Sequence, residues 1–316
     1  MITQAECVID VEHLRKCYGD FPAVDDISFT VKRGEVFAFL GPNGAGKTTS
    51  VEIIDTIRTP TSGKVYVLGM DVIKKKQDII PRIGVLPQGF SSFDRITVRE
   101  TLQYYARLFG SRMADIDGLI KLVNLHDKAE VRYMNLSGGL KQRLGIAIAL
   151  VNDPEIVFLD EPTTGLDPRA RREVWEVLLG LKKEGKTVFL TTHYMEEAEI
   201  LADTVAIISK GKIIAADTPR QLIENNAECM ILTLLSADEN ALDVVRKMGF
   251  APDPTHNKNI TVKVADTEDI RKILNAIKDA GGFFLGMDVR KPNLEHVFLK
   301  LTGESLHEDT SGKGTK

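Results

Sequence analysis

This sequence has few cysteines, and its positive and negative charges nearly balance. The 316 residues include three cysteines, Cys7, Cys17 and Cys229, which lie far apart and lack the short spacings of a metal site. We therefore expect reduced thiols, as in a cytosolic protein. The net charge of −4 lacks the basic excess typical of a general nucleic-acid-binding protein, so we expect no nucleic-acid partner.

Long hydrophobic segments are absent as well. The longest unbroken apolar run, Ile146–Val151, is far shorter than the ~20 residues that a membrane-spanning helix needs. The N-terminal segment 1–7 has neither the basic nor the apolar part of a secretory signal. If this protein acts at a membrane, we expect another chain to cross it.

The remaining composition is that of a globular protein with more than one domain. Hydrophobic residues make up 43% and charged residues 27%, and the chain is long enough for two domains. Strand and helix patterns alternate over residues 1–217, which predicts an α/β domain with a parallel sheet and a helical insertion at about 89–151. Residues 218–303 predict a small α+β domain, and the polar residues 304–316 predict a disordered tail.

Eight residues organise the first domain. They begin at Gly41 and fit the pattern G-x-x-x-x-G-K-[ST] of a phosphate-binding loop. The pattern requires a strand before it and a helix after it, and Glu35–Leu40 and Thr49–Ile57 have those periodicities. Backbone N–H groups and the positive end of the helix dipole would surround a phosphate chain. The residues predicted to bind a nucleoside triphosphate are Gly41, Pro42, Asn43, Gly44, Ala45, Gly46, Lys47, Thr48 and Thr49.

Four side chains are predicted to carry the chemistry at this loop. Lys47 would reach the β- and γ-phosphates, and the Thr48 hydroxyl would ligate Mg²⁺. The apolar run Ile156–Leu159 ends in two acids, Asp160 and Glu161. Next to a phosphate loop, Asp160 is expected near Mg²⁺ and Glu161 is expected to act as the base for the attacking water. Without that loop, the segment would be an ordinary buried strand with a polar end.

The sequence Leu-Ser-Gly-Gly precedes a helical pattern at Leu136–Gly139, and here the chain resembles the ATP-binding subunit of an ABC (ATP-binding-cassette) transporter. Ser137 is a favourable N-cap, and Gly138 and Gly139 expose backbone N–H groups at a helix start. A capped helix alone would explain these residues. The resemblance implies that Ser137, Gly138 and Gly139 form a second anion site that binds ATP. It also implies the P-loop NTPase core of an ABC-type ATPase, in which an antiparallel β-subdomain accompanies the parallel sheet and the helical insertion.

Further residues match motifs of the same family in the same order. Tyr18 matches the aromatic residue that stacks on adenine, and Gln88 matches the glutamine that contacts Mg²⁺ and the attacking water. Gly165–Pro168 matches the loop that crosses between two subunits, and His193 matches the histidine that contacts the γ-phosphate. Leu140 departs from the glutamine that many members carry there, so we assign it no nucleotide contact.

The resemblance also implies a mechanism and partners. Two copies, or one copy and a homologous cassette, would pair head to tail, hydrolyse MgATP between them and power an integral membrane permease. The subunit would lie at the cytoplasmic face of the membrane, and the insertion between Gln88 and Ser137 would dock the permease. The segment Pro292–Gly303 resembles the end of daunorubicin-resistance and sodium-efflux ATPases, which implies export. It also fits an amphipathic terminal helix that packs within its own domain.

Two other functions stay open from the sequence. A soluble cassette ATPase that acts on ribosomes or DNA usually has two cassettes or a long coiled-coil insertion, whereas this chain has one phosphate loop and a short insertion. A regulatory switch, in which the C-terminal domain senses a ligand, would be favoured by a degenerate catalytic acid, but Glu161 is present.

Overall fold

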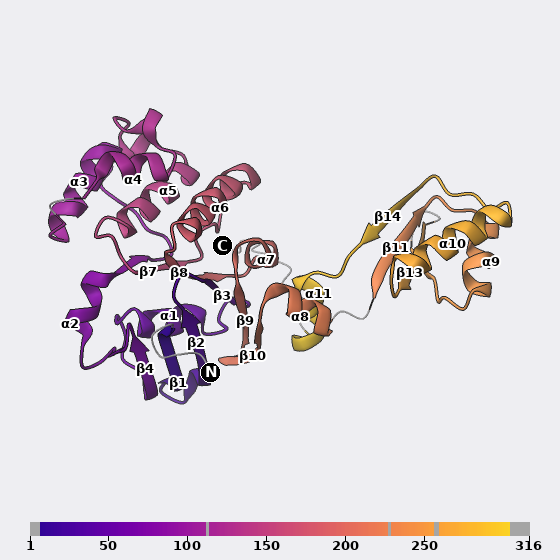
Figure 1. Ribbon diagram of the computed structural model, residues 1–316, viewed down its shortest axis with the longest axis horizontal. Coiled ribbons are helices and arrows are strands. Elements are labelled where there is room, and N and C mark those ends of the chain that lie inside the picture. Colours follow the sequence, from indigo (N-terminus) through magenta and orange to yellow (C-terminus); the bar gives the residue numbers. More distant parts are fainter. Residues whose placement is uncertain (1–6, 112–113, 227–228, 256–258, 304–316) are drawn as a thin grey trace, which may run out of the picture. The chain divides into compact units, whose positions relative to one another are not determined.

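The computed structural model describes residues 7–111, 114–226, 229–255 and 259–303 (Figure 1). The chain forms two compact units, one that extends to Pro219 and one that comprises Arg220–Gly303. Each unit is described by itself. The tail predicted at 304–316 lies outside the described residues.

An antiparallel sheet begins the first unit. Strands β1 (Cys7–Tyr18) and β2 (Phe21–Lys32) form a hairpin, and β4 (Ser62–Val67) and β5 (Met70–Asp71) extend the sheet in the order β2-β1-β4-β5. The hairpin strands are longer than the segments 7–14 and 27–32 predicted from the sequence. Gly19 adopts a φ of +59°, which lets a two-residue turn replace the longer predicted one.

A second, largely parallel sheet forms the centre of the unit. Its strand order is β10-β9-β3-β8-β7-β6, and every neighbouring pair is parallel except β9 with β10. Parallel strands end at the same edge of a sheet, so the loops that follow these strands gather there. The strands are β3 (Val36–Leu40), β6 (Ile83–Leu86), β7 (Ile156–Asp160), β8 (Thr187–Thr192), β9 (Thr204–Ser209) and β10 (Lys212–Asp217).

The helical insertion consists of α3 (Val98–Leu108), α4 (Ile116–Leu122) and α5 (Gly138–Ala149), which gather on one side of the unit in Figure 1. Thr97 starts α3 with a capping box, in which its hydroxyl accepts from the Glu100 N–H and the Glu100 carboxylate accepts from the Thr97 N–H. Short helical turns connect these helices. They are η2 (His126–Lys128) and η3 (Tyr133–Asn135).

The remaining helices of the unit accompany the central sheet. Helix α1 (Lys47–Ile54) follows the phosphate loop, and α6 (Pro168–Lys183) and α7 (Met195–Leu201) follow β7 and β8. The turns α2 (Lys76–Ile79) and η1 (Ile80–Arg82) lead into β6. Asp167 caps α6 and Pro168 is its first residue.

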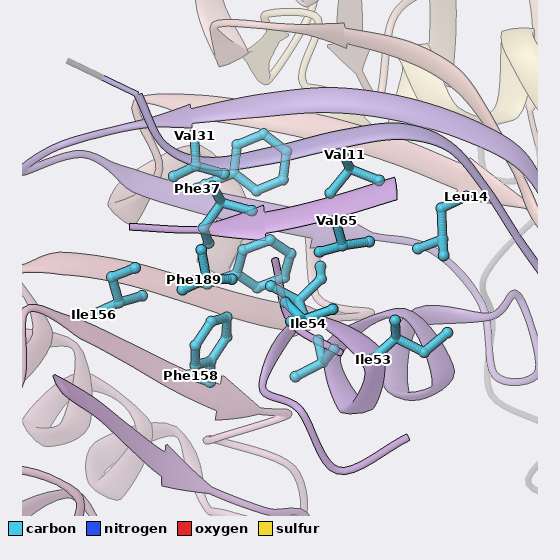
Figure 2. Close-up of a cluster of buried hydrophobic side chains, with 14 of the residues drawn as sticks. Val11, Leu14, Val31, Phe37, Ile53, Ile54, Val65, Ile156, Phe158 and Phe189 are labelled. Atoms are coloured by element: carbon cyan, nitrogen blue, oxygen red, sulfur yellow. The ribbon is translucent and has the colours of Figure 1, made fainter. Parts of the chain in front are cut away.

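A hydrophobic core joins the two sheets and α1 (Figure 2). Phe37 and Phe189 lie with ring centroids 5.2 Å apart, and Phe158 and Phe189 lie 5.7 Å apart. The rings come from neighbouring strands of the central sheet, while Ile53 and Ile54 of α1 pack against the same cluster. This packing fixes α1, and with it the phosphate loop, on the central sheet.

The second unit contains one antiparallel sheet of order β12-β13-β11-β14. The helices α9 (Glu239–Lys247) and α10 (Thr267–Asp279) cover a core that includes Leu232, Leu234 and Ile273. The sequence patterns do not predict helix α8 or strand β12. Strand β12 is very short and contains Pro254, which is typical of an edge strand. The other elements are α8 (Pro219–Asn226), β11 (Met230–Leu235), β12 (Asp253–Thr255), β13 (Asn259–Val264), β14 (Gly286–Arg290) and α11 (Leu294–Thr302).

Across the described residues, none of the helices combines the length and the apolar character that crossing a bilayer requires.

Candidate nucleotide-binding site

The central sheet brings four of the sequence-predicted elements to one edge. The phosphate loop follows β3, Gln88 follows β6, Asp160 ends β7 and His193 follows β8. These four strands occupy adjacent positions in the sheet. Residues that lie up to about 150 positions apart in the sequence therefore meet at the carboxyl ends of the strands.

The phosphate loop has no room for side chains at two of its glycines. A Cβ atom on Gly41 would lie 2.2 Å from the Ile208 carbonyl oxygen, and one on Gly46 would lie 2.3 Å from the Ala23 carbonyl oxygen. Gly46 also has a φ of +101° at the start of α1, a conformation that glycine tolerates best. These positions require glycine for the backbone to approach so closely.

Lys47 is the first residue of α1 and is only 4% exposed. Its Nζ donates to the carbonyl oxygens of Gly41 and Pro42, at 2.8 and 3.0 Å, and lies 3.2 Å from Glu161 Oε1. Burial lowers the pKa of Lys47, while the carboxylates of Glu161 and Asp160 raise it. The ammonium group is thus held inside the loop, where a phosphate group would find a point charge.

Asp160 and Thr48 form the part of the site that fits a magnesium ion. The Thr48 hydroxyl donates to Asp160 Oδ2 at 2.9 Å, and the Thr191 hydroxyl donates to Asp160 Oδ1. Hydroxyl, carboxylate and amide oxygens are hard ligands of the type that Mg²⁺ accepts. No group of three or more His, Cys, Asp or Glu that could hold a metal occurs among the described residues. A single carboxylate suits Mg²⁺, which takes most other ligands from water and phosphate.

Glu161 is the residue on which the other predicted catalytic side chains converge. Gln88 Nε2 donates to Glu161 Oε2 at 3.1 Å, and the Thr164 hydroxyl donates to the same oxygen at 3.0 Å. His193 Nδ1 lies 3.4 Å from Glu161 Oε2. Contact with the His193 ring, together with the Lys47 ammonium and the Thr164 hydroxyl, lowers the pKa of Glu161 to about 2 against the opposing effect of burial. The side chain is therefore a carboxylate throughout the neutral range.

The backbone at Glu161 is in a rare conformation. Its φ is +48°, which a side chain with a Cβ adopts only when the surroundings enforce it. Thr191 supplies that constraint, because its hydroxyl and carbonyl oxygens both accept from the Glu161 N–H, at 3.0 and 3.2 Å. The turn directs the Glu161 side chain toward the phosphate loop.

A cavity of about 400 Å³ lies in front of these groups. Tyr18 lines it and is 43% exposed. The Nζ of Lys16 and the Cζ of Arg58 lie 5.4 and 5.6 Å from the centre of the Tyr18 ring. The lining residues are Tyr18, Phe21, Ala23, Asn43, Gly44, Gly46, Lys47, Thr48, Thr49, Gln88 and Glu161.

The structure does not bring Ser137, Gly138 and Gly139 to this cavity. Ser137 is exposed and caps α5, accepting a hydrogen bond from the Leu140 N–H at 3.4 Å. A Cβ on Gly139 would lie 2.7 Å from the Cβ of Ala170 in α6. Gly139 thus packs beside the start of α6, whereas Ser137 and Gly138 are exposed.

Two functional positions escape the sequence reasoning. Thr191 holds Asp160 and the Glu161 backbone, and Thr164 binds the Glu161 carboxylate. The polar end of the buried strand β8 signals Thr191, since Thr191 and Thr192 interrupt an apolar run. A threonine in a loop offers no comparable signal for Thr164.

Comparison with known proteins gives a consistent result. A protein-family model described as ABC transporter matches residues 24–164. The Nod factor export ATP-binding protein I of Rhizobium meliloti (strain 1021) is 41% identical over 305 residues, covering 95% of this chain and 89% of that protein. The protein of the same name from Bradyrhizobium diazoefficiens is 38% identical and covers 97% and 100%.

Solved structures agree with these relatives. The ATP-binding cassette MJ0796, in a dimeric post-hydrolysis state bound to ADP and Pi, is 27% identical with a TM-score of 0.60, over 66% of this chain and 98% of that one. The ATP-binding cassette MJ1267 in its ADP conformation is 22% identical with a TM-score of 0.62, over 70% of this chain and 94% of that one, and supports the fold alone. The predicted α/β cassette fold is confirmed.

Proposed function

This chain belongs to the ABC transporter family, whose ATP-binding subunits couple ATP hydrolysis to transport, and we propose roles for its individual residues in that reaction. The observation that carries the proposal is the convergence of Lys47, Gln88, Thr164 and His193 on the Glu161 carboxylate. Such a cluster at the mouth of a phosphate loop suits the activation of water beside a terminal phosphate.

Nucleotide binding falls to the loop Gly41–Thr49, with the adenine on Tyr18. Lys47 neutralises the β- and γ-phosphates, and the oxygens of Thr48, Asp160 and Gln88 hold Mg²⁺. The ion, when bound, neutralises charge that develops on the phosphates.

Glu161 accepts the proton of the attacking water, and His193 contacts the γ-phosphate. A phosphate at Lys47 competes with Glu161 for the ammonium group, which lies 3.2 Å from the carboxylate. Weakening that ion pair removes one of the causes of the low pKa of Glu161, after the contact with His193, and so raises this pKa. Binding of ATP thereby makes Glu161 a better base at the moment when a base is needed.

A second copy, or a homologous cassette, completes the site head to tail. Ser137 and Gly138 are exposed at the start of α5, so the backbone N–H groups of this helix start suit a γ-phosphate that another subunit holds. The pairing of two cassettes explains why one chain carries both halves of the site without joining them.

The permease binds a groove of about 500 Å³ between the segment that follows α1, the turns α2 and η1, strand β6 and the ends of α3 and α5. Ile57, Ile80, Leu108 and Phe109 line this groove and are all exposed, which is typical of a surface that another protein covers. The groove includes part of the predicted docking insertion. Because the relatives are named for export, and the end of the chain resembles that of exporter ATPases, we propose that the subunit powers export from the cytoplasmic face of a membrane.

We also propose that residues 1–217 and 218–303 act as an ATP-binding domain and an accessory domain. Truncation after Asp217 is expected to leave a folded cassette that binds ATP with unchanged affinity but dimerises less tightly or couples less well to transport. Nucleotide affinity, dimer mass and transport in vesicles containing the permease measure this. A folded truncated chain that fails to bind ATP would show that the accessory domain belongs to the nucleotide site.

A direct experiment tests the docking groove. Leu108→Asp is expected to release the subunit from membranes that contain its permease and to leave ATP binding intact. Ile214→Asp is the matched control, because Ile214 is an exposed apolar residue on β10 outside the groove. Equal release by both variants, or by neither, would contradict docking at this groove.

A further inference from the structure

Helix α7 carries an acid that takes no part in the site described above. Glu197 is fully buried, four residues after His193. Its Oε1 accepts hydrogen bonds from the Thr163 hydroxyl at 2.8 Å and from Trp175 Nε1 at 3.0 Å. Its Oε2 has no hydrogen-bond partner among the described residues. A carboxylate this deep is costly to bury, so packing alone is a weak reason for an acid here.

The partners of Glu197 belong to segments that meet the nucleotide site. Thr163 lies in the turn that begins at Glu161, where the Thr164 N–H donates to the Glu161 carbonyl oxygen and the Leu166 N–H donates to the Thr163 carbonyl oxygen. The two neighbouring threonines are therefore divided between two carboxylates. Thr164 binds the Glu161 side chain, and Thr163 binds Glu197.

The same carboxylate also reaches the helix that follows the turn. Trp175 lies on α6, which Asp167 caps at its start. Near Glu197, the Cζ of Arg171 lies 4.0 Å from the centre of the Tyr194 ring, and the rings of Tyr194 and His193 lie 4.1 Å apart. One buried acid thus joins the turn 161–166, helix α6 and the start of α7.

We propose that Glu197 is a positioning residue for ATP hydrolysis, which holds the turn after Glu161 in place through Thr163. This inference rests on the proposed function. Without the Thr163 bond, the turn loses its attachment to α7, and the neighbouring Thr164 holds the Glu161 carboxylate less firmly. Small errors in the placement of a catalytic group cost up to ~10²-fold in rate.

The test compares two hydrogen bonds to the same carboxylate oxygen. Thr163→Val, which is nearly isosteric, is expected to lower kcat by about tenfold to a hundredfold and to leave the KM for ATP unchanged, because Tyr18 and the phosphate loop keep their contacts. Thr163→Ser restores the hydroxyl and is expected to restore kcat. Trp175→Phe removes the other bond and is expected to leave kcat within about twofold, with thermal unfolding measured for every variant.

A second measurement separates positioning from general stability. In a Glu161→Gln background, Thr163→Val is expected to slow hydrolysis no further, because the group that it positions is already absent. Wild-type kcat in Thr163→Val overturns the proposal. So does a loss of kcat in Trp175→Phe that matches Thr163→Val and follows the melting temperature. If the wild-type rate equals that of Lys47→Ala in the same preparation, the proposed function itself is wrong, and the role of Glu197 is wrong with it.

Discussion

The phosphate loop and the segment Ser137–Gly139 are both glycine-rich helix starts, yet their surroundings differ. Lys47 is buried and is bound to two carbonyl groups and a carboxylate of its own chain. Ser137 is exposed, and its side chain only caps its own helix. The phosphate loop is thus packed within its own chain, whereas Ser137 and Gly138 of the second segment are exposed at the start of α5.

This difference follows from where the two loops begin. The phosphate loop follows a central strand, so the loops of β6, β7 and β8 surround it at the sheet edge. The segment at Ser137 follows a short helical turn, η3, and its nearest neighbour is the start of α6. Substitutions in the first loop should therefore damage binding, and those in the second should damage only the reaction that requires a partner subunit.

Lys47→Ala, in the phosphate loop, should have the largest effect. The phosphates lose their buried point charge, and Glu161 loses the cation beside it, so we expect hydrolysis to fall to background and ATP affinity to drop. Hydrolysis and nucleotide affinity of the purified variant measure this, with Lys64→Ala, at an exposed position on β4, as the control. Turnover near the wild-type rate would mean that this loop is not the phosphate site.

Ser137→Arg tests the segment Ser137–Gly139. The bulky cation fills the space that the partner's γ-phosphate must enter, so hydrolysis should fall to background, while ATP affinity of the single subunit stays at the wild-type value. Titration with a fluorescent nucleotide at low protein concentration measures affinity apart from pairing. Comparable loss of affinity and of melting temperature would indicate misfolding of the start of α5 instead.

Glu161→Gln tests both the phosphate loop of one subunit and its pairing with Ser137–Gly139 of another. The amide is nearly isosteric but accepts no proton, so hydrolysis should slow by ~10²–10⁴-fold, while MgATP binding is retained and the ATP-bound chain runs as a dimer. Size-exclusion chromatography with light scattering reports the mass. A chain that stays monomeric at saturating ATP would contradict the pairing of isolated subunits.

The same variant carries a pH signature. The pKa of Glu161 is lowered to about 2 in the folded protein, so its ionisation stabilises the fold above the unfolded value near 4.5 and ceases to do so as pH falls toward 2. The difference in melting temperature between wild type and Glu161→Gln should therefore shrink over that range. A difference that is constant from pH 6 to pH 3 would contradict the ion-pair environment of Glu161.

The comparison of the two halves also shows what sequence can predict. The family, the fold class and the ATPase activity follow from the motifs and are confirmed by the relatives and solved structures. A motif predicts a fold when its residues act on their own backbone, as Gly41 and Gly46 do. The individual roles of the site residues stay predictions.

Contacts between distant segments are harder to predict. Nothing in the local sequence of Thr164 indicates that its hydroxyl binds the Glu161 carboxylate, and the polar end of β8 marks Thr191 without showing that it binds Asp160 on the neighbouring strand. Glu197 is harder still, since an acid in a helical pattern with Glu196 and Glu199 predicts a solvated face, whereas the structure buries it. Tertiary packing decides which of several similar side chains enters the core, and periodicity over a seven-residue helix is too short to specify it.

Tyr18→Ala should have the smallest effect among the residues that line the nucleotide cavity. The ring lines the cavity but is 43% exposed, so the loss of stacking on adenine should cost about 1 kcal/mol, or about fivefold in ATP affinity. The maximal rate at saturating ATP should not change, because the ring lies away from the phosphates. Tyr18→Phe keeps the ring and should bind as the wild type does.

Phe21 lines the same cavity and is more exposed. If Phe21→Ala weakens binding and Tyr18→Ala does not, the stacking ring is Phe21, and the assignment made from the family motif is wrong.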